Sequence, residues 1–144
     1  MSPIETVGRD LAERYIGAVQ AADLKSFGAL FAEDVRVFDL WGPTWSFEGR
    51  AAWLTSVQAW FDSLGEETVR VSFEDIRVSG AQTVGVLTAV VTYKAISKAG
   101  EELRSLQNRL TWTFEDRGAS WLIAHEHTSA PILHEGLKAL LKRS

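Results

Sequence analysis

LRSLQNRLTWTFEDRGASWLIAHEHTS, residues 103–129, predicts two β-strands joined by a turn. Both halves, at about residues 103–115 and 120–129, are rich in the threonine, aromatic and branched apolar residues that favour strands. Asp116–Ala119 supplies the aspartate and glycine that turns prefer. The stretch is therefore expected to form an antiparallel hairpin, and the register of that hairpin decides which side chains face the interior.

The expected register follows from placing the turn at Asp116–Ala119. Phe114 then faces Trp121 on one side of the hairpin, and Arg109 faces Glu126 on the other. The face of Arg109 and Glu126 is expected to carry five further residues: Thr111, Thr113, Leu122, Ala124 and Thr128. Arg109 and Glu126 are either a cross-strand ion pair or, if their face lines a pocket, a site where the guanidinium clamps a carboxylate or enolate.

The rest of the chain predicts helices first and strands after. The elements expected outside the hairpin are a helix from the Ser2-Pro3-Ile4-Glu5 capping box to about residue 21, a short helix capped by Asp23, a strand Val35–Asp39, a helix between Gly49 and Gly65, strands at about 68–78 and 82–97, and a terminal helix Ile132–Arg143. This order predicts one α+β domain over residues 1–144, with N-terminal helices packed against a curved antiparallel sheet.

Composition excludes several classes of function. The chain has 144 residues, no cysteine and a net charge of −4. A disulfide framework and a thiolate metal site are therefore absent, and the scattered basic residues argue against a nucleic-acid partner. No apolar run is long enough for a membrane span, and the first residues do not resemble a signal peptide. We expect a cytoplasmic protein.

Two residues have side chains suited to proton chemistry. Asp39 is flanked by Phe38, Leu40 and Trp41, and burial among such neighbours raises the pKa of a carboxyl toward that of a general base. The alternative is a solvated aspartate that forms a turn. Tyr15 lies on the apolar face of the first helix, where its hydroxyl either donates to a ligand oxygen or bonds to the protein itself.

Four short segments follow one another in the first part of the chain: Arg14-Tyr15-Ile16, Asp23-Leu24, Leu30-Phe31-Ala32-Glu33-Asp34 and Val37-Phe38-Asp39. They resemble the opening of the ketosteroid isomerase branch of the nuclear transport factor 2-like superfamily, also called the SnoaL-like superfamily. The resemblance implies a cone-shaped fold, a Tyr15 that donates to the substrate oxyanion and an Asp39 that moves the proton. It also implies a protonated acid on the penultimate strand, where Asn108–Thr111 contains none.

A second resemblance lies at the end of the hairpin, in Trp121, His125, His127, Ser129 and Pro131. This ending is similar to that of a SnoaL-like subgroup and of the association domain of calcium/calmodulin-dependent kinases. The association domain forms oligomers and keeps a carboxylate-binding arginine in its pocket.

The two resemblances together imply that Arg109, Thr111 and Glu126 lie inside the cone. The aromatic face is then left for a dimer partner. The apolar residues by themselves favour the opposite, with the aromatic face over the core. We follow the family pattern.

His125 and His127 share one face of a strand, which is one geometry for two metal ligands. No third ligand is evident in the sequence, so packed or interfacial histidines are expected, with no metal and no cofactor.

Together these observations predict a pocket between the helices and the sheet. Beyond Tyr15, Asp39 and Arg109 as candidate catalytic groups, the expected pocket residues are Trp41 (or Trp45) at the lip, then Trp53, Val57, Trp60, Thr111, Glu126 and Thr128. The predicted function is proton transfer next to a carbonyl, of isomerase, cyclase or dehydratase type. The alternative is a non-catalytic ligand-binding or oligomerisation module. The expected partners are a small hydrophobic or carboxylate-bearing ligand and a second copy bound through the sheet.

Overall fold

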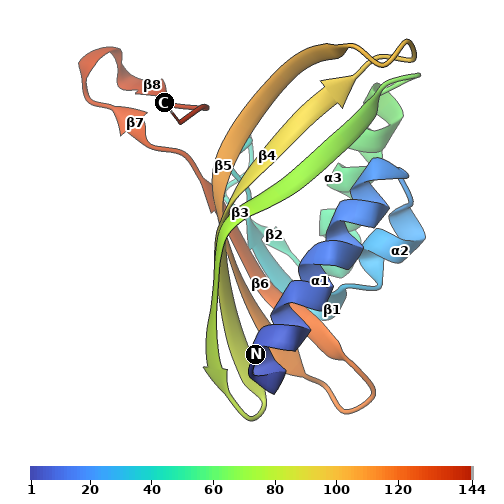
Figure 1. The fold of residues 1–144 in the computed structure, drawn as a ribbon, viewed down its shortest axis with the longest axis vertical. Coiled ribbons are helices and arrows are strands. Elements are labelled where there is room, and N and C mark those ends of the chain that lie inside the picture. Colours follow the sequence, from blue (N-terminus) through green and yellow to red (C-terminus); the bar gives the residue numbers. More distant parts are fainter. Residues whose placement is uncertain (144) are drawn as a thin grey trace.

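The fold is a curved sheet wrapped around helices, in a computed structural model that describes residues 1–143 (Figure 1). The sheet order is β2-β1-β6-β5-β4-β3, with the helices on the concave side (Figure 1). The elements are α1 Pro3–Gln20, α2 Leu24–Gly28, β1 Phe31–Phe38, β2 Phe47–Glu48, α3 Arg50–Ser63, β3 Thr68–Ala81, β4 Val84–Ile96, β5 Glu102–Asp116, β6 Trp121–Ser129, β7 Ile132–Leu133, the 3₁₀ turn Glu135–Leu137 and β8 Lys138–Ala139. The α+β class and the cone shape are confirmed. The wholly antiparallel sheet is wrong at one place, because β1 pairs with β6 in parallel.

The helix starts follow from the capping residues that the sequence supplies. Ser2 Oγ accepts a hydrogen bond from Glu5 N at 3.2 Å, and Pro3 occupies the first helical position, where its missing N–H costs nothing. Asp23 Oδ1 accepts from Ser26 N at 3.1 Å at the start of α2. The apolar face of α1 is buried on the sheet, which brings Tyr15 into the interior.

Irregular positions bend the sheet into a cone. β3 has a shift in its pairing with β4 between Glu74 and Arg77, where Asp75 takes the left-handed conformation with φ of 52°. On β4, Gly85 lies against the ring of Phe114, and a Cβ at that position would overlap the ring. At this position an aromatic side chain therefore packs directly on backbone that carries no side chain.

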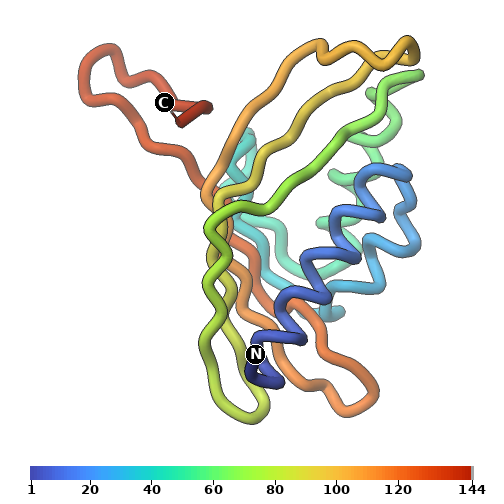
Figure 2. Tube along the Cα trace, viewed as in Figure 1, coloured from blue at the N-terminus to red at the C-terminus, as the bar shows by residue number. Residues whose placement is uncertain are grey.

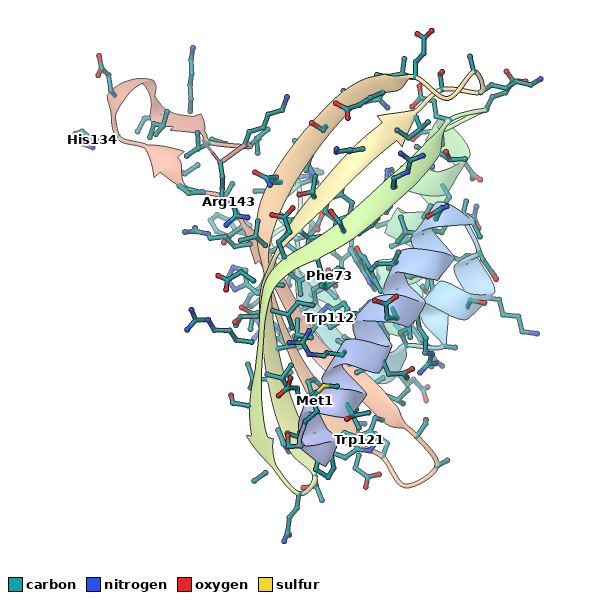
Figure 3. The ribbon with its side chains drawn as sticks, viewed as in Figure 1. Met1, Phe73, Trp112, Trp121, His134 and Arg143 are labelled. Atoms are coloured by element: carbon teal, nitrogen blue, oxygen red, sulfur yellow. The ribbon has the colours of Figure 1, made fainter. Side chains whose placement is uncertain are left out.

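Large side chains fill the space between the sheet and the helices. Figure 3 shows Phe73 and Trp112 on the concave side, next to α1, and their ring centroids are 5.5 Å apart. Trp112 and Phe114 are fully buried. The aromatic face of β5 therefore covers the core, as the apolar residues by themselves indicate, and is not left for a partner.

The expected register of the last hairpin is wrong. Phe114 pairs with Ile123, Trp112 with Glu126, and Arg109 with Ser129. A bulge between Thr113 and Phe114 places one extra residue on β6, and an extra residue reverses the faces of all residues beyond it. Arg109 and Glu126 consequently lie on opposite faces of the sheet.

The expected terminal helix is also wrong. Residues 132–139 form the small β7–β8 hairpin, which projects from the body of the molecule (Figures 1 and 2). Figure 3 shows His134 on this projecting part and Arg143 back beside the sheet. Gly136 adopts a left-handed φ of 78°, which no continuous helix accommodates. The chain then returns, and Leu141 O accepts a hydrogen bond of 2.6 Å from Gln107 N, on β5 beyond the last residue that pairs with β6. In the described part of the chain, none of the helices combines the length and apolar character needed to span a membrane.

Candidate functional site

A cavity of about 630 Å³ opens between α1, α3 and the concave face of the sheet. Its size is within the range of small-molecule sites, and most of its lining is apolar. Eight of the residues expected from the sequence line it: Tyr15, Asp39, Trp41, Trp53, Val57, Trp60, Glu126 and Thr128. Arg109 and Thr111 do not. Trp45, the alternative lip residue, is 95% exposed on the outside.

Asp39 follows the last residue of β1 and lies half-buried in the cavity wall. Thr128 Oγ1 donates to its Oδ1 at 3.2 Å, and Trp41 N donates to its Oδ2 at 3.4 Å. The backbone N–H of Leu40 in turn donates to Thr128 Oγ1 at 2.8 Å, which fixes that hydroxyl in place. Burial raises the pKa of Asp39, while the hydrogen bonds from Thr128 and the backbone act in the opposite direction. Asp39 is therefore part of the cavity and not a solvated turn residue.

The Tyr15 hydroxyl lies 2.9 Å from the hydroxyl of Tyr93 on β4. Burial raises the pKa of both phenols, so both are protonated donors at neutral pH. The amide of Asn108 hydrogen-bonds to Tyr93, which lowers the pKa of that phenol against the effect of burial. Sequence reasoning missed Tyr93. One signal was available. Tyr93 is one of two tyrosines in the chain, and it lies two positions from Val91 and from Ala95, so it shares their apolar face of the strand.

Glu126 is the most deeply buried acid of the cavity, at 2% exposure. Trp112 Nε1 donates to its Oε1 at 2.8 Å. Burial raises the pKa of Glu126 to about 8; the hydrogen bond from Trp112 opposes this shift, and the charge of Asp39 adds to it. The carboxyl is therefore mainly protonated at neutral pH. Glu126 is thus a buried acid on β6, whereas Asn108–Thr111 on β5 contains no acid.

Two polar atoms of the lining residues have no partner among the described residues. They are Trp53 Nε1, a donor, and Asn108 Oδ1, an acceptor. A buried polar group without a partner costs about 1–3 kcal/mol. The lining residues of the cavity therefore hold hydrogen-bonding capacity that the protein itself leaves unused.

Arg109 is exposed on the convex face, where its Nε donates to Ser129 Oγ at 3.0 Å. The expected clamp formed with Glu126 is therefore absent. Within residues 1–143, the cation that lines the cavity is Arg104, and its Nη2 is 2.7 Å from Glu67 Oε1. Among the described residues that line the cavity, no positive charge is without an acidic partner.

The two histidines of β6 pack against Phe38, whose ring centroid is 5.2 Å from that of His125 and 5.5 Å from that of His127. His125 Nδ1 donates to the carbonyl of Arg36 at 2.7 Å. Over the residues that the structure describes, no three histidine, aspartate or glutamate side chains gather as a metal site.

Comparisons with known proteins agree with this fold. The sequence has no significant match among curated proteins. An uncharacterised NTF2-like protein from Pseudomonas putida KT2440 is 24% identical, with a TM-score of 0.84 over 97% of this chain and 95% of that one. A protein from Streptomyces avermitilis, provisionally assigned as a dehydratase of the NTF2-like family, is 16% identical, with a TM-score of 0.71 over 90% and 97%.

A third solved structure is similar over most of its length. It comes from Xanthomonas campestris and is provisionally assigned as a calcium/calmodulin-dependent protein kinase II association domain. It is 18% identical, with a TM-score of 0.73 over 86% of this chain and 85% of that one. At such identities these structures establish the fold alone. Residues 9–133, most of the chain, match the sequence profile of the SnoaL-like domain. The chain therefore belongs to the SnoaL-like domain family, within the nuclear transport factor 2-like fold.

Proposed function

We propose that the cavity binds an uncharged small molecule with a carbonyl group, and that Asp39 removes a proton from the carbon next to that carbonyl. The observation that carries this proposal is the composition of the polar wall. A carboxyl with a raised pKa shares one cavity with a pair of protonated phenols. A base and an oxyanion site are the two groups that enolisation requires.

Asp39 has the properties of a general base. Its hydrogen bonds from Thr128 and the Trp41 amide favour the ionised form, whereas burial brings its pKa closer to neutrality. A carboxylate with a raised pKa is a stronger acceptor of a carbon-bound proton than a solvated one. The same two hydrogen bonds hold the carboxylate in a fixed orientation at the edge of the cavity.

The two tyrosines supply the oxyanion site. The amide of Asn108 donates to the Tyr93 hydroxyl, and the two phenols share one further hydrogen bond in which either hydroxyl is able to donate. That bond uses one phenol proton, so the other remains free to bond to a ligand oxygen in the cavity that both tyrosines line. In such a chain each hydrogen bond polarises the next, which strengthens the terminal donor as negative charge develops on the ligand.

The ligand is uncharged because two acids line the cavity, and the one cation among its described lining residues, Arg104, is paired. An anionic ligand would meet the carboxylate of Asp39 without a compensating positive charge, and a desolvated unpaired charge is costly. This argument replaces the carboxylate-bearing ligand expected from the sequence, since that expectation depended on an inward-facing Arg109.

The test is hydrogen–deuterium exchange at C2 of 1-tetralone, a bicyclic ketone, in D₂O, followed by NMR. We expect the protein to accelerate the exchange and Asp39→Asn to lose on the order of 10²–10⁴-fold, because an amide does not accept the proton. Arg109→Leu, on the convex face, is the matched control and should exchange at the parent rate. An Asp39→Asn variant as fast as the parent would remove Asp39 from the mechanism. A ketone that binds without exchange would identify a ligand-binding module.

A further inference from the structure

Two carboxyl groups face one cavity, and abstraction of a proton by Asp39 uses only one of them. Val37 pairs with Glu126 in the parallel β1–β6 ladder, so Asp39 lies two residues farther along, beside Thr128. Glu126 and Thr128 are likewise two residues apart and share the inner face of β6. Two residues of strand span roughly 6–7 Å, so both acids lie on one wall and face the same side of a bound molecule.

The surroundings of the two acids suit opposite roles. Thr128 and a backbone N–H donate to Asp39, and such bonds stabilise a carboxylate. Glu126 is deep in the cavity with one oxygen bonded to Trp112 Nε1 and the other without a hydrogen-bond partner in the described structure. Where two carboxyls have environments of this kind, one acts as the base and the other as the acid.

We propose that Glu126 is the general acid of a dehydration, and that the substrate is an uncharged carbonyl compound with a hydroxyl on the second carbon from the carbonyl. The proposal rests on the proposed function, because Asp39 and the tyrosine pair act on the same carbonyl in both. It adds the leaving group, the residue that protonates it and the substrate class.

The bonds and protons of this step balance. Asp39 takes the proton from the carbon next to the carbonyl, and the electron pair of that C–H bond forms the new carbon–carbon double bond through the enolate. The C–O bond at the next carbon breaks with its electron pair on oxygen, and the proton of Glu126 converts that oxygen to water. Asp39 is then protonated and Glu126 ionised, and return of one proton from Asp39 to Glu126 restores the resting state.

Trp112 stabilises the ionised form of Glu126 that remains after the acid has given up its proton. Its indole N–H donates to Glu126 Oε1, and a hydrogen bond to a charged acceptor is roughly twice as strong as one to a neutral acceptor. The bond therefore strengthens as the proton leaves. If Glu126 only filled space in the core, its carboxyl would not need a hydrogen-bond donor from Trp112.

The experiment compares two compounds on one skeleton. The compound 3-hydroxy-1-tetralone loses water to give 1-naphthol, whose fluorescence reports dehydration, while 1-tetralone lacks the hydroxyl and reports proton exchange alone. Glu126→Gln keeps the acceptor for Trp112 and remains a hydrogen-bond donor, but it has no proton to transfer. We expect this variant to lose on the order of 10²–10⁴-fold in dehydration and to retain exchange within about threefold of the parent. Retained exchange also shows that the variant is folded.

Each outcome separates the two proposals. If Glu126→Gln dehydrates as fast as the parent, or loses exchange and dehydration equally, Glu126 is not the acid, while the function proposed for Asp39 stands. If the unaltered protein accelerates neither reaction, both proposals are wrong.

A second measurement does not depend on the variant. The rate of dehydration by the parent should fall as the pH rises through about 8, where Glu126 ionises. The titratable groups that face Glu126 are Asp39, Tyr15 and Tyr93. The rate of proton exchange should not fall in this pH range.

Discussion

Burial of Glu126 has a consequence for stability that requires no substrate. Its pKa is about 8 in the folded protein, against 4.5 for an unperturbed glutamate. The folded state therefore holds a proton that the unfolded chain releases. Since the folded pKa is the higher one, the contribution of this group to stability is complete below about pH 4.5 and is lost as the pH rises to about 8.

The magnitude follows from the size of the pKa interval. One pKa unit corresponds to about 1.4 kcal/mol, so the interval between 4.5 and about 8 corresponds to about 5 kcal/mol, of which about 3 kcal/mol is lost by pH 7. Glu126→Gln does not titrate and still accepts from Trp112. We expect the variant to match the parent near pH 4.5 and to exceed it by about 3–5 kcal/mol near pH 8.

The measurement is urea unfolding followed by tryptophan fluorescence at several pH values. With a slope of roughly 1–3 kcal/mol per molar urea, the difference in midpoint should grow by about 1 M or more between pH 5 and 8. Asp39 titrates in both proteins, so its own contribution is common to both, and only its interaction with Glu126 enters the difference. Glu135→Gln, at an exposed glutamate of the projecting hairpin, is the surface control. A difference between variant and parent that does not change with pH would refute the protonated, buried state of Glu126.

Two further predictions concern packing and assembly. Gly85→Ala would place a methyl group against the Phe114 ring. We expect this substitution to lower the free energy of unfolding by about 1–3 kcal/mol in the same urea assay. An unchanged urea midpoint would mean that the ring moves freely. The helices cover only the concave face of the sheet (Figure 1), so we predict a homodimer formed through the convex face, and a monomer at micromolar concentration in sedimentation would contradict it.

Short-range patterns in the sequence were enough for most of the elements. The capping residues Ser2 and Asp23 set the helix starts, and alternation identified the long strands. These signals depend on residues a few positions apart, so a single chain contains all the information they need. Tyr15 and Asp39 were identified as candidates for the same reason, from their apolar neighbours and from the family resemblance.

The terminal segment shows where local pattern misleads. Leucines at helical spacing after Ile132 predicted a helix, yet in the structure Leu137 and Leu140 are exposed and the chain forms a hairpin. An isolated helix of this length is marginal without a surface to pack on. In this chain the segment leaves the body of the molecule, and its last residues pair with β5 at Gln107 instead.

The sequence by itself determined the class of fold, the order of most elements up to β6 and eight of the residues that line the cavity, Tyr15 and Asp39 among them. Tertiary structure decided which side of β5 and β6 faces the cavity, because one bulge near Phe114 reverses the side chains beyond it and nothing local marks its position. It also moved Arg109 to the outer surface and brought Tyr93 to Tyr15 across 78 positions of the chain. The protonation of Glu126 is likewise a tertiary property, because the shift in its pKa comes chiefly from burial, and burial exists only once distant segments have closed around the carboxyl.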